Sequence, residues 1–256
     1  MRKLGERVRL AFSSGPAFLF LRLFCLGFCG SYRLRTPELE WFDDAAFNEF
    51  LTRFGERRGL NADRRWMLYQ LLRAIGDIDG DTAECGVFRG ASSYLICAAN
   101  AAGRKPRTHH LFDSFAGLSA PDPIDGSHWR QHDLRYDLEK VRASLSRFTA
   151  LEYHPGWIPD RFSDVENRRF CFVHIDVDLY APTRDSIRFF YPRLSPGGIV
   201  VCDDYGFASC PGATQAIDEY LADKPERMIG LSDGGGFLIR GMVVSDPAPI
   251  VEGTKG

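Results

Sequence analysis

The amino-acid sequence predicts a doubly wound α/β domain, in which a largely parallel seven-stranded sheet carries helices on both faces. Three observations lead to this prediction. Short apolar runs alternate with segments of helical period over residues 61–243, which is the pattern of parallel βαβ units. A chain of 256 residues can bury a large core. Several apolar runs end in glycine or aspartate, at the place where a doubly wound sheet binds its ligands.

The elements follow one another in a regular order. Residues 62–77 carry Trp66, Leu68 and Leu72 at helical spacing, which predicts an amphipathic helix ahead of the sheet. Residues 1–60 are expected to form an N-terminal helical and apolar extension, and residues 244–256 a flexible tail. The predicted strands are residues 82–87, 109–112, 150–154, 169–176, 199–202, 227–229 and 236–240. The helices expected between them end near residue 102 or span residues 134–148, 182–194 and 214–221.

The composition gives no support for a nucleic-acid partner. The formal net charge is -2, whereas nucleic-acid-binding domains usually carry a strongly basic surface. The 7 cysteines include no set with the spacing of zinc ligands. Cys85, Cys171 and Cys202 fall within apolar strands, and we expect them to be buried free thiols. These features favour a reducing compartment and a cytoplasmic location.

An apolar segment, residues 16–30, follows several basic residues near the N-terminus. A secretory signal has a similar arrangement. However, Arg22 interrupts the apolar run, no clean cleavage site follows it, and the run is short for a membrane span. We expect a helix that packs on the domain or on a partner subunit. Weak contact with a membrane surface is the second interpretation, and a signal or anchor is the third.

The loop after the first predicted strand has the features of a cofactor site. Gly86 and Gly90 remove side chains where a ligand must approach the backbone, and the helix that begins near Ser92 points its N-terminus at the ligand. The spacing differs from the G-x-G-x-x-G of nicotinamide enzymes. S-adenosylmethionine has no pyrophosphate, and an acid such as Glu84 suits its ammonium and sulfonium groups. The alternative is an ordinary glycine turn.

Asp113 follows the second predicted strand, 23 residues beyond Gly90 (113 − 90). An acidic residue at this point of a doubly wound fold commonly accepts hydrogen bonds from ribose hydroxyls. The alternative is a helix-capping aspartate. Together with the preceding glycine loop, Asp113 favours a ligand that contains a ribose.

Acidic residues also follow the fourth and fifth predicted strands. Asp176 ends one strand, and Asp203 and Asp204 follow the next. If these strands are neighbours, the three carboxylates repel one another unless a cation lies between them. Oxygen ligands favour magnesium, calcium or manganese. The alternative is that the acids are separate caps and solvated loop residues. Asp178 is expected to lie outside the ring of metal ligands or to face an acceptor.

A metal at this place suits the methylation of a hydroxyl group. A sugar or alcohol hydroxyl is a poor nucleophile at neutral pH, and a dication stabilises its alkoxide. Methyl transfer depends on in-line alignment, and a nearby carboxylate can take the proton. Asp176 is the first candidate for this catalytic base as well as for a metal ligand. His174, on the same face of the strand, is expected to be structural, and His110 is a reserve candidate.

Six segments in this order resemble the macrocin O-methyltransferase family, whose members methylate sugar hydroxyls of macrolide and aminocoumarin antibiotics. Together they span most of residues 60–240. Val177, Phe88 and Ala91 depart from the glycine, tryptophan and glycine that are usual in the family. The segments are ECGVFRGASS (84–93), LFDSFAGL (111–118), PGWIPD (155–160), HIDVDLYAPTRDSI (174–187), YPRLSPGGIVVCDDYG (191–206) and ATQAIDEY (213–220).

The resemblance implies a Rossmann-like class I methyltransferase fold, S-adenosylmethionine as methyl donor, and a homo-oligomer. It implies Mg²⁺ at Asp176, Asp203 and Asp204, with Asp176 as the base, and an adenine near Gly156 and Trp157. The expected cofactor contacts are Glu84, Gly86, Val87, Arg89, Gly90, Ser92, Asp113, Ser114, Gly156, Trp157 and Asp176.

The acceptor does not follow from these motifs. We expect the loop at residues 116–134, with His128, Trp129 and His132, to cover it. A hydroxyl of a sugar or glycosylated natural product is the expected class, and a glycan or a lipid stays open. Two other functions remain as alternatives. A metal-dependent nucleotide-sugar glycosyltransferase would use the D-x-D motif at residues 176–178, and a non-catalytic subunit would keep the fold only for binding.

Overall fold

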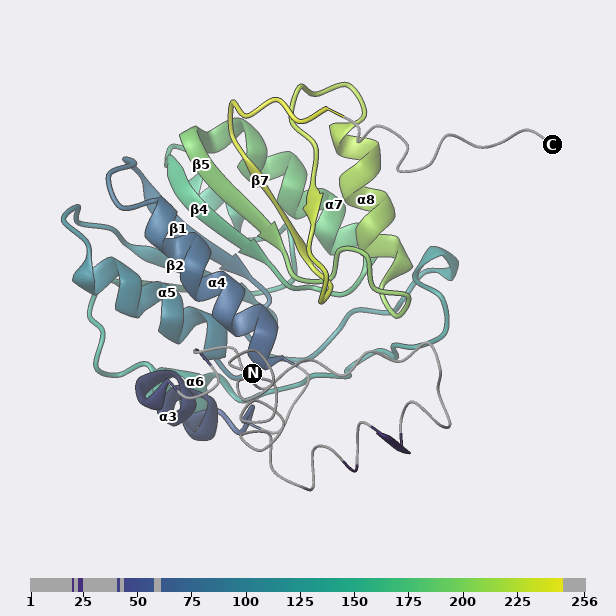
Figure 1. The fold of residues 1–256 in the computed structure, drawn as a ribbon. Helices are drawn as coiled ribbons and strands as arrows, with labels where there is room; N and C mark the ends of the chain where they lie inside the picture. The colour runs from purple at the N-terminus through teal and green to yellow at the C-terminus, as the bar shows by residue number, and fades with distance from the viewer. Residues whose placement is uncertain (1–19, 21–22, 25–40, 42–43, 58–60, 246–256) are drawn as a thin grey trace, which may run out of the picture. The chain divides into compact units, whose positions relative to one another are not determined.

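The computed structural model describes residues 20, 23–24, 41, 44–57 and 61–245 (Figure 1). The chain divides into two compact units, Met1–Gly59 and Leu60–Gly256. The predicted apolar segment at residues 16–30 lies almost wholly outside the described residues, as does most of the predicted tail at residues 244–256.

In the first unit, helix α3 spans Ala45–Arg53. Asp44 caps its N-terminus, because its side chain accepts a hydrogen bond from the backbone N–H of Phe47 at 2.7 Å. The ring of Phe50 lies between those of Phe47 and Phe54, with centroid separations of 5.8 and 5.3 Å. Local capping and aromatic contacts therefore define this helix within its own unit.

The second unit contains a seven-stranded sheet with the strand order β3-β2-β1-β4-β5-β7-β6. β1 to β5 are parallel, whereas β7 is antiparallel to β5 and β6. The predicted doubly wound seven-stranded fold is confirmed, and the fourth and fifth strands are neighbours. The strands are β1 (Asp81–Cys85), β2 (His109–Asp113), β3 (Leu151–Pro155), β4 (Phe170–Ile175), β5 (Leu194–Cys202), β6 (Ile229–Gly230) and β7 (Gly236–Ile239).

Helices cover both faces of the sheet (Figure 1). α4 and α5 pack together on one face, whereas α7 and α8 pack together on the other. α6 joins the first face, where its Val141 and the following Leu145 cluster with Leu111 of β2. No helix within the described ranges is both long and apolar enough to cross a membrane. The helices are α4 (Ala62–Ala74), α5 (Ala91–Ala102), α6 (Leu138–Ser144), α7 (Tyr180–Phe190) and α8 (Pro211–Leu221).

The two faces of the sheet differ in chemistry. Beneath α7 and α8, the strands present apolar side chains such as Phe112 and Val173, and these form the main core with Phe190 and Ile217. Beneath α4 and α5, several of the alternate positions of the same strands form a buried polar row. This row consists of Thr82 and Glu84 of β1, His109 of β2 and His174 of β4, all of them buried. The cysteines predicted as buried free thiols, Cys85, Cys171 and Cys202, are confirmed as such.

β5 begins at Leu194 rather than at residue 199, where the sequence predicts it. The intervening proline and glycines predict a turn that closes the preceding helix. In the structure this stretch instead pairs with the backbone of Arg240. Gly197 N–H donates to the Arg240 carbonyl at 2.9 Å, and Arg240 N–H donates to the Gly198 carbonyl at 2.8 Å. The register between β4 and β5 shifts at the same point. A bulge thus accommodates the proline and glycines within the sheet.

Two helices begin at residues other than those predicted. α6 begins at Leu138, because the side chain of Asp137 accepts a hydrogen bond from the backbone N–H of Glu139 at 2.8 Å and caps the helix there. α8 begins at Pro211, which lies in the first helical turn, where a missing N–H costs no hydrogen bond. Capping chemistry rather than apolar period sets both boundaries.

Candidate active site

The loops that follow β1 to β5 are joined to one another by backbone hydrogen bonds at one edge of the sheet. Each bond links the first residues of one loop to the end of a neighbouring strand. The predicted cofactor and metal segments therefore lie side by side. The bonds run from Gly86 N–H to Phe112 O at 2.9 Å, Asp176 N–H to Cys85 O at 2.8 Å, Asp203 N–H to Ile175 O at 2.8 Å, and Gly156 N–H to Asp113 O at 3.0 Å.

Gly86 lies where the loops after β1 and β4 approach most closely. Its φ is +85°, a conformation that favours glycine. A β-carbon at this position would lie only 1.7 Å from the carbonyl oxygen of Asp176. Gly90 also has a positive φ, of +80°, and forms the N-cap of α5. The two glycines are thus required by backbone geometry, and they leave the N-terminus of α5 facing the loop.

Asp113 anchors the loop after β1. One of its carboxylate oxygens accepts hydrogen bonds from the backbone N–H groups of Val87 at 2.7 Å and Phe88 at 3.0 Å. The other accepts from the N–H of Phe115 at 2.6 Å. Phe88 and Phe115 both have positive φ angles, of 48° and 53°, so two strained residues are held by one carboxylate. The residue predicted to bind ribose therefore fixes the backbone of the loop predicted to bind the cofactor.

Glu84 and Ser92, two of the predicted cofactor contacts, are buried beneath this edge. Glu84 is 1% exposed, and its carboxylate accepts a short hydrogen bond from the hydroxyl of Ser93. Burial acts to raise the pKa of Glu84, but the imidazoles of His109 and His174, at 3.6 and 3.3 Å, lower it to about 2. The hydroxyl of Ser92 accepts a hydrogen bond from the Arg65 guanidinium. Both side chains are thus buried and hydrogen-bonded next to the loop that follows β1.

His174 connects Glu84 to the predicted metal site. Its Nδ1 lies 3.3 Å from the Glu84 carboxylate and its Nε2 lies 3.9 Å from that of Asp203. The side chain is fully buried. Burial acts to lower the pKa of His174, but its contacts with Asp203 and Glu84 raise it to about 10. A positively charged, structural histidine between two carboxylates agrees with the expected role.

The structure groups the four strand-end aspartates in two pairs. Asp176 and Asp203 converge with His174, with one ligand atom of each within 4.8 Å of the others. Asp204 instead lies with Asp178 and Cys210 in a second group of the same kind. The predicted triad of Asp176, Asp203 and Asp204 is therefore divided between two adjacent groups.

Asp204 is turned toward the loop that follows β4. One of its carboxylate oxygens accepts hydrogen bonds from the backbone N–H groups of Val177 at 3.0 Å and Asp178 at 2.7 Å. Asp178 has a φ of +61°, which is strained for a residue with a side chain. Asp204 thus fixes the strained turn between Asp176, which lies in the first group, and Asp178, which lies in the second.

Two arginine side chains lie close to the carboxylate of Asp203. The guanidinium of Arg64 lies 2.7 Å from its carboxylate, and that of Arg65 lies 3.9 Å away. Arg64 also donates a hydrogen bond to the backbone carbonyl of Asp203 at 3.1 Å. Although burial acts to raise the pKa of Asp203, its contact with His174 and the two arginines hold it well below its ordinary value. Asp203 is therefore charged and fixed in place.

The other three aspartates have raised pKa values. Burial raises the pKa of Asp176 to about 7, and the charge of Asp203 adds to this rise. Burial raises the pKa of Asp178 to about 6 and that of Asp204 well above its ordinary value. Full ionisation of these carboxyl groups is therefore unfavourable unless a further positive charge lies nearby. A buried set of oxygen donors of this kind fits a divalent cation.

The loop at residues 116–134 is attached next to the second group of acids. Its Asp125 accepts a hydrogen bond from the backbone N–H of Tyr180 at 2.6 Å, at the start of α7. The indole N–H of Trp129 donates to the sulfur of Cys210 at 3.3 Å, just before α8. The same sulfur lies 3.6 Å from the Asp178 carboxylate. The loop is therefore anchored beside the acids, where it was expected to cover an acceptor.

Three further predicted contacts lie in the loops after β1, β2 and β3. The guanidinium of Arg89 lies over the ring of Phe88, 5.0 Å from its centroid. The hydroxyl of Ser114 donates to the carbonyl of Gly117 at 2.8 Å and so closes its own turn. Trp157 follows Gly156 and is 39% exposed, which leaves a large aromatic surface at the end of β3.

Sequence reasoning missed Arg64 and Arg65 as parts of this site. Both lie in the first turn of α4, and Arg65 is buried on the same helix face as Leu68 and Leu72. The sequence does contain one indication, because Arg65 is spaced to lie on the apolar face of this helix. A charged residue on a buried face needs a buried partner. The identity of that partner, Asp203, depends on the tertiary fold.

The part of the chain that contains these loops is similar in sequence to known proteins. The profile of the family described as macrocin-O-methyltransferase (TylF) matches residues 63–228. The chain is 36% identical over 150 residues to 8-demethyl-8-(2,3-dimethoxy-alpha-L-rhamnosyl)-tetracenomycin-C 4'-O-methyltransferase of Streptomyces olivaceus, which covers 53% of this chain and 57% of that protein. It is 32% identical over 178 residues to demethyldecarbamoylnovobiocin O-methyltransferase of Streptomyces niveus, which covers 64% of this chain and 67% of that protein.

The chain thus spans 57% to 67% of the length of these two curated relatives. Among solved structures, it is similar to the O-methyltransferase NovP, with a TM-score of 0.57 and 26% sequence identity over 70% of this chain and 80% of that one. The matched family region contains every strand-end loop from β1 to β5.

Proposed function

Because the chain belongs to the macrocin O-methyltransferase family, we propose that it transfers a methyl group from S-adenosylmethionine to a hydroxyl of a sugar or glycosylated natural product. Residues 61–243 carry this activity. The proposal is supported by the relatives named above, which methylate a rhamnosyl-bearing tetracenomycin and a novobiocin precursor. It is also supported by the row of loops at the carboxyl ends of β1 to β5, where a doubly wound fold binds its ligands.

The proposed cofactor site lies along the loops after β1, β2 and β3. S-adenosylmethionine supplies the methyl group. Gly86 and Gly90 let it approach the backbone at the N-terminus of α5, and Asp113 accepts hydrogen bonds from its ribose. Trp157, exposed after Gly156, offers a flat surface to the adenine. Glu84 and Ser92 hold this loop from below, since both are buried in polar networks.

The proposed metal site consists of Asp176 and Asp203, with Asp204 beside them. A bound Mg²⁺ would stabilise the deprotonated acceptor hydroxyl and fix its direction. The fit rests on the donor set, because all of these groups offer carboxylate oxygens and because burial raises the pKa of Asp176 and Asp204, so that a nearby cation would favour their ionised form. Arg64 and Arg65 keep Asp203 ionised and oriented.

Asp176 is the proposed base. It is the least buried of the four strand-end aspartates, because Asp178, Asp203 and Asp204 are only 5%, 4% and 3% exposed. Its backbone carbonyl also lies against Gly86, in the glycine loop proposed to bind the methyl donor. In this proposal the Asp176 carboxylate accepts the proton of an acceptor hydroxyl bound between that loop and the metal site.

The single observation that best supports this proposal is the backbone contact between Gly86 and Asp176, because it joins the glycine loop after β1 to the acidic segment after β4. Titration calorimetry with S-adenosylhomocysteine, with and without Mg²⁺, tests it. We expect binding by the wild-type chain and no binding of a uridine diphosphate sugar. The reverse result would support the glycosyltransferase alternative, and binding of neither would contradict the methyltransferase assignment.

A further inference from the structure

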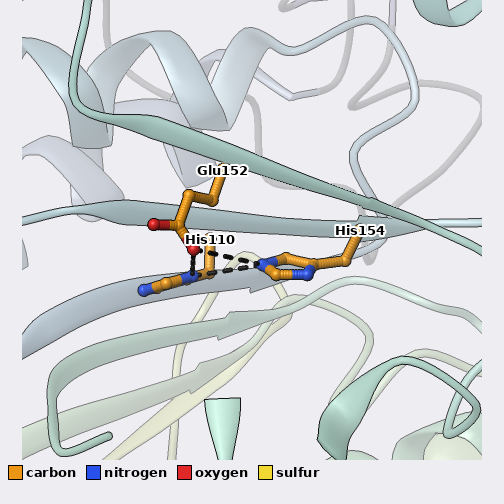
Figure 2. Close-up of side chains that lie close together, drawn as sticks. All are labelled: His110, Glu152 and His154. Atoms are coloured by element: carbon orange, nitrogen blue, oxygen red, sulfur yellow. Dashed lines mark hydrogen bonds and ion pairs between the residues drawn. The ribbon is translucent and has the colours of Figure 1, made fainter. Parts of the chain in front are cut away.

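A second group of metal-ligating side chains lies away from the aspartate cluster. It consists of His110 on β2 and of Glu152 and His154 on β3, which converge in Figure 2. The parallel register places His110 directly beside Glu152. Because side chains alternate along a strand, His154 lies on the same face as Glu152. These three residues, called here the His110 cluster, face the opposite side of the sheet from Glu84.

The spacing of the His110 cluster fits tetrahedral coordination. His110 Nδ1 lies 3.2 Å from His154 Nε2 and 3.3 Å from a carboxylate oxygen of Glu152. The third side of the triangle, from His154 Nε2 to that oxygen, is 4.0 Å. Zinc binds nitrogen and oxygen ligands at roughly 2.0 to 2.2 Å, which separates the donors of a tetrahedral site by about 3.3 to 3.6 Å. Only the distance from His154 Nε2 to the Glu152 oxygen must shorten when the ion binds.

The outer nitrogens of both histidines face carboxylates. His110 Nε2 lies 3.4 Å from Asp81, and His154 Nδ1 lies 2.9 Å from Asp164. If each outer nitrogen donates its hydrogen to its aspartate, both inner nitrogens present lone pairs to one another. A cation bound between them would then remove the repulsion of the two lone pairs. Carboxylates behind metal-binding histidines are the usual means of fixing this tautomer.

The two aspartates are themselves held in place. Asp81 accepts a hydrogen bond from the backbone N–H of Thr108 at 2.9 Å. Asp164 accepts two from the guanidinium of Arg161, at 2.9 and 2.6 Å. The orientation of both imidazoles is thus set from outside the His110 cluster, before any ligand binds.

The His110 cluster is also accessible from one side. His110 is 0% exposed and His154 is 5% exposed, and the ring of His154 stacks on that of Phe112 at 4.4 Å. The side chain of Glu152, in contrast, is 49% exposed. Two rigid, buried nitrogens and one carboxylate at the surface leave a path for an ion and a fourth position open to solvent.

We propose that His110 Nδ1, His154 Nε2 and the Glu152 carboxylate bind a Zn²⁺ ion, with solvent as the fourth ligand, and that this ion fastens the edge strand β3 to β2. Imidazole nitrogens favour zinc over magnesium, so this site and the aspartate cluster select different metals. β3 leads directly into Gly156 and Trp157, and an ion here would hold that segment against β2.

Cobalt spectroscopy tests the proposal, since tetrahedral Co²⁺ absorbs visible light far more strongly than octahedral Co²⁺. The full chain is stripped with a chelator and titrated with Co²⁺ in excess Mg²⁺. We expect one equivalent of tetrahedral Co²⁺, which Zn²⁺ displaces. Glu152→Ala, at an exposed position, and His154→Gln weaken this binding by roughly tenfold or more. Glu139→Ala, an exposed acid on α6, and Asp203→Asn leave it unchanged.

Thermal unfolding gives a second readout. At a Zn²⁺ concentration near a hundred times Kd, we expect the Tm of the wild-type chain to rise by roughly 5 to 10 °C, and the rise to be lost in Glu152→Ala. Three results overturn the proposal. They are no tetrahedral spectrum in the wild type, an unchanged spectrum in Glu152→Ala, and loss of the spectrum in Asp203→Asn.

Discussion

The carbonyl oxygen of Asp176 occupies the space in which any residue other than glycine at position 86 would place its β-carbon, 1.7 Å away. The loops after β1 and β4 therefore touch backbone to backbone. On one side of this contact lies the N-terminus of α5, and on the other lie the aspartates that follow β4 and β5. The proposed methyl donor and the proposed metal meet at this contact.

Replacement of Gly86 by alanine tests the contact. Gly86→Ala forces the two loops apart, so we expect affinity for S-adenosylhomocysteine to fall by roughly tenfold or more. The matched control is Gly241→Ala, since Gly241 has a similar φ of +88° and a β-carbon there would meet nothing within 4 Å. That variant bears only the backbone strain, about 1 to 2 kcal/mol. Equal losses of affinity in both variants would show that the contact is unimportant.

Acid stability tests the buried network around Glu84. Its folded pKa of about 2 lies below its ordinary value of 4.5, so its contribution to stability is complete above pH 4.5 and is lost as the pH falls toward 2. The shift corresponds to about 3 kcal/mol. We expect urea unfolding of wild-type protein to show this loss and Glu84→Gln to show a flatter profile. The exposed control Glu139→Gln should follow the wild type, and parallel profiles for all three would refute the assignment.

Arg65 is predicted to stabilise the site through its charge. It is 7% exposed and faces Asp203 and Ser92. Arg65→Met leaves part of a buried charge uncompensated, so we expect a loss of about 3 kcal/mol, or a Tm lower by roughly 6 to 12 °C. Arg73→Met, at an exposed position in the last turn of α4, is the control in the same calorimetric scan. A similar Tm for both variants would contradict the prediction.

Two tryptophans should separate acceptor binding from cofactor binding. Trp129 attaches its loop to Cys210, so Trp129→Ala should raise the KM for the acceptor by roughly tenfold while affinity for S-adenosylhomocysteine stays within about twofold. Trp157→Ala should give the opposite pattern. Steady-state kinetics and calorimetry measure the two effects. Loss of cofactor affinity in Trp129→Ala would place that loop at the donor instead.

The sequence allows the strands to be predicted well, because apolar runs such as that of β4 are buried on both faces and have one consistent interpretation. It fails at Ser195–Gly198, since proline and glycine are compatible with both a turn and a bulge, and only pairing with Arg240 decides between them. Local chemistry therefore locates most elements but does not determine the ends of β5.

The site was predicted in part for a similar reason. Acids at strand ends can be located from the sequence, and Asp176 and Asp203 do lie together. The direction of Asp204 depends on the strained backbone of Asp178, and the partners of Asp203 come from a helix more than a hundred residues earlier in the chain. The His110 cluster depends on the register of β2 and β3. None of these relationships leaves a local pattern.

Mass spectrometry of the acceptor after incubation with S-adenosylmethionine is the most direct test of metal-assisted O-methylation. The acceptor panel contains 8-demethyl-8-(2,3-dimethoxy-alpha-L-rhamnosyl)-tetracenomycin C and demethyldecarbamoylnovobiocin, the compounds in the names of the two relatives. We predict that one acceptor gains a single methyl group with Mg²⁺, and that chelation or Asp203→Asn lowers the rate by roughly a hundredfold or more. The control variant Asp223→Asn, at an exposed position, should keep the wild-type rate. Full methylation in chelator, or in Asp203→Asn, would contradict the account.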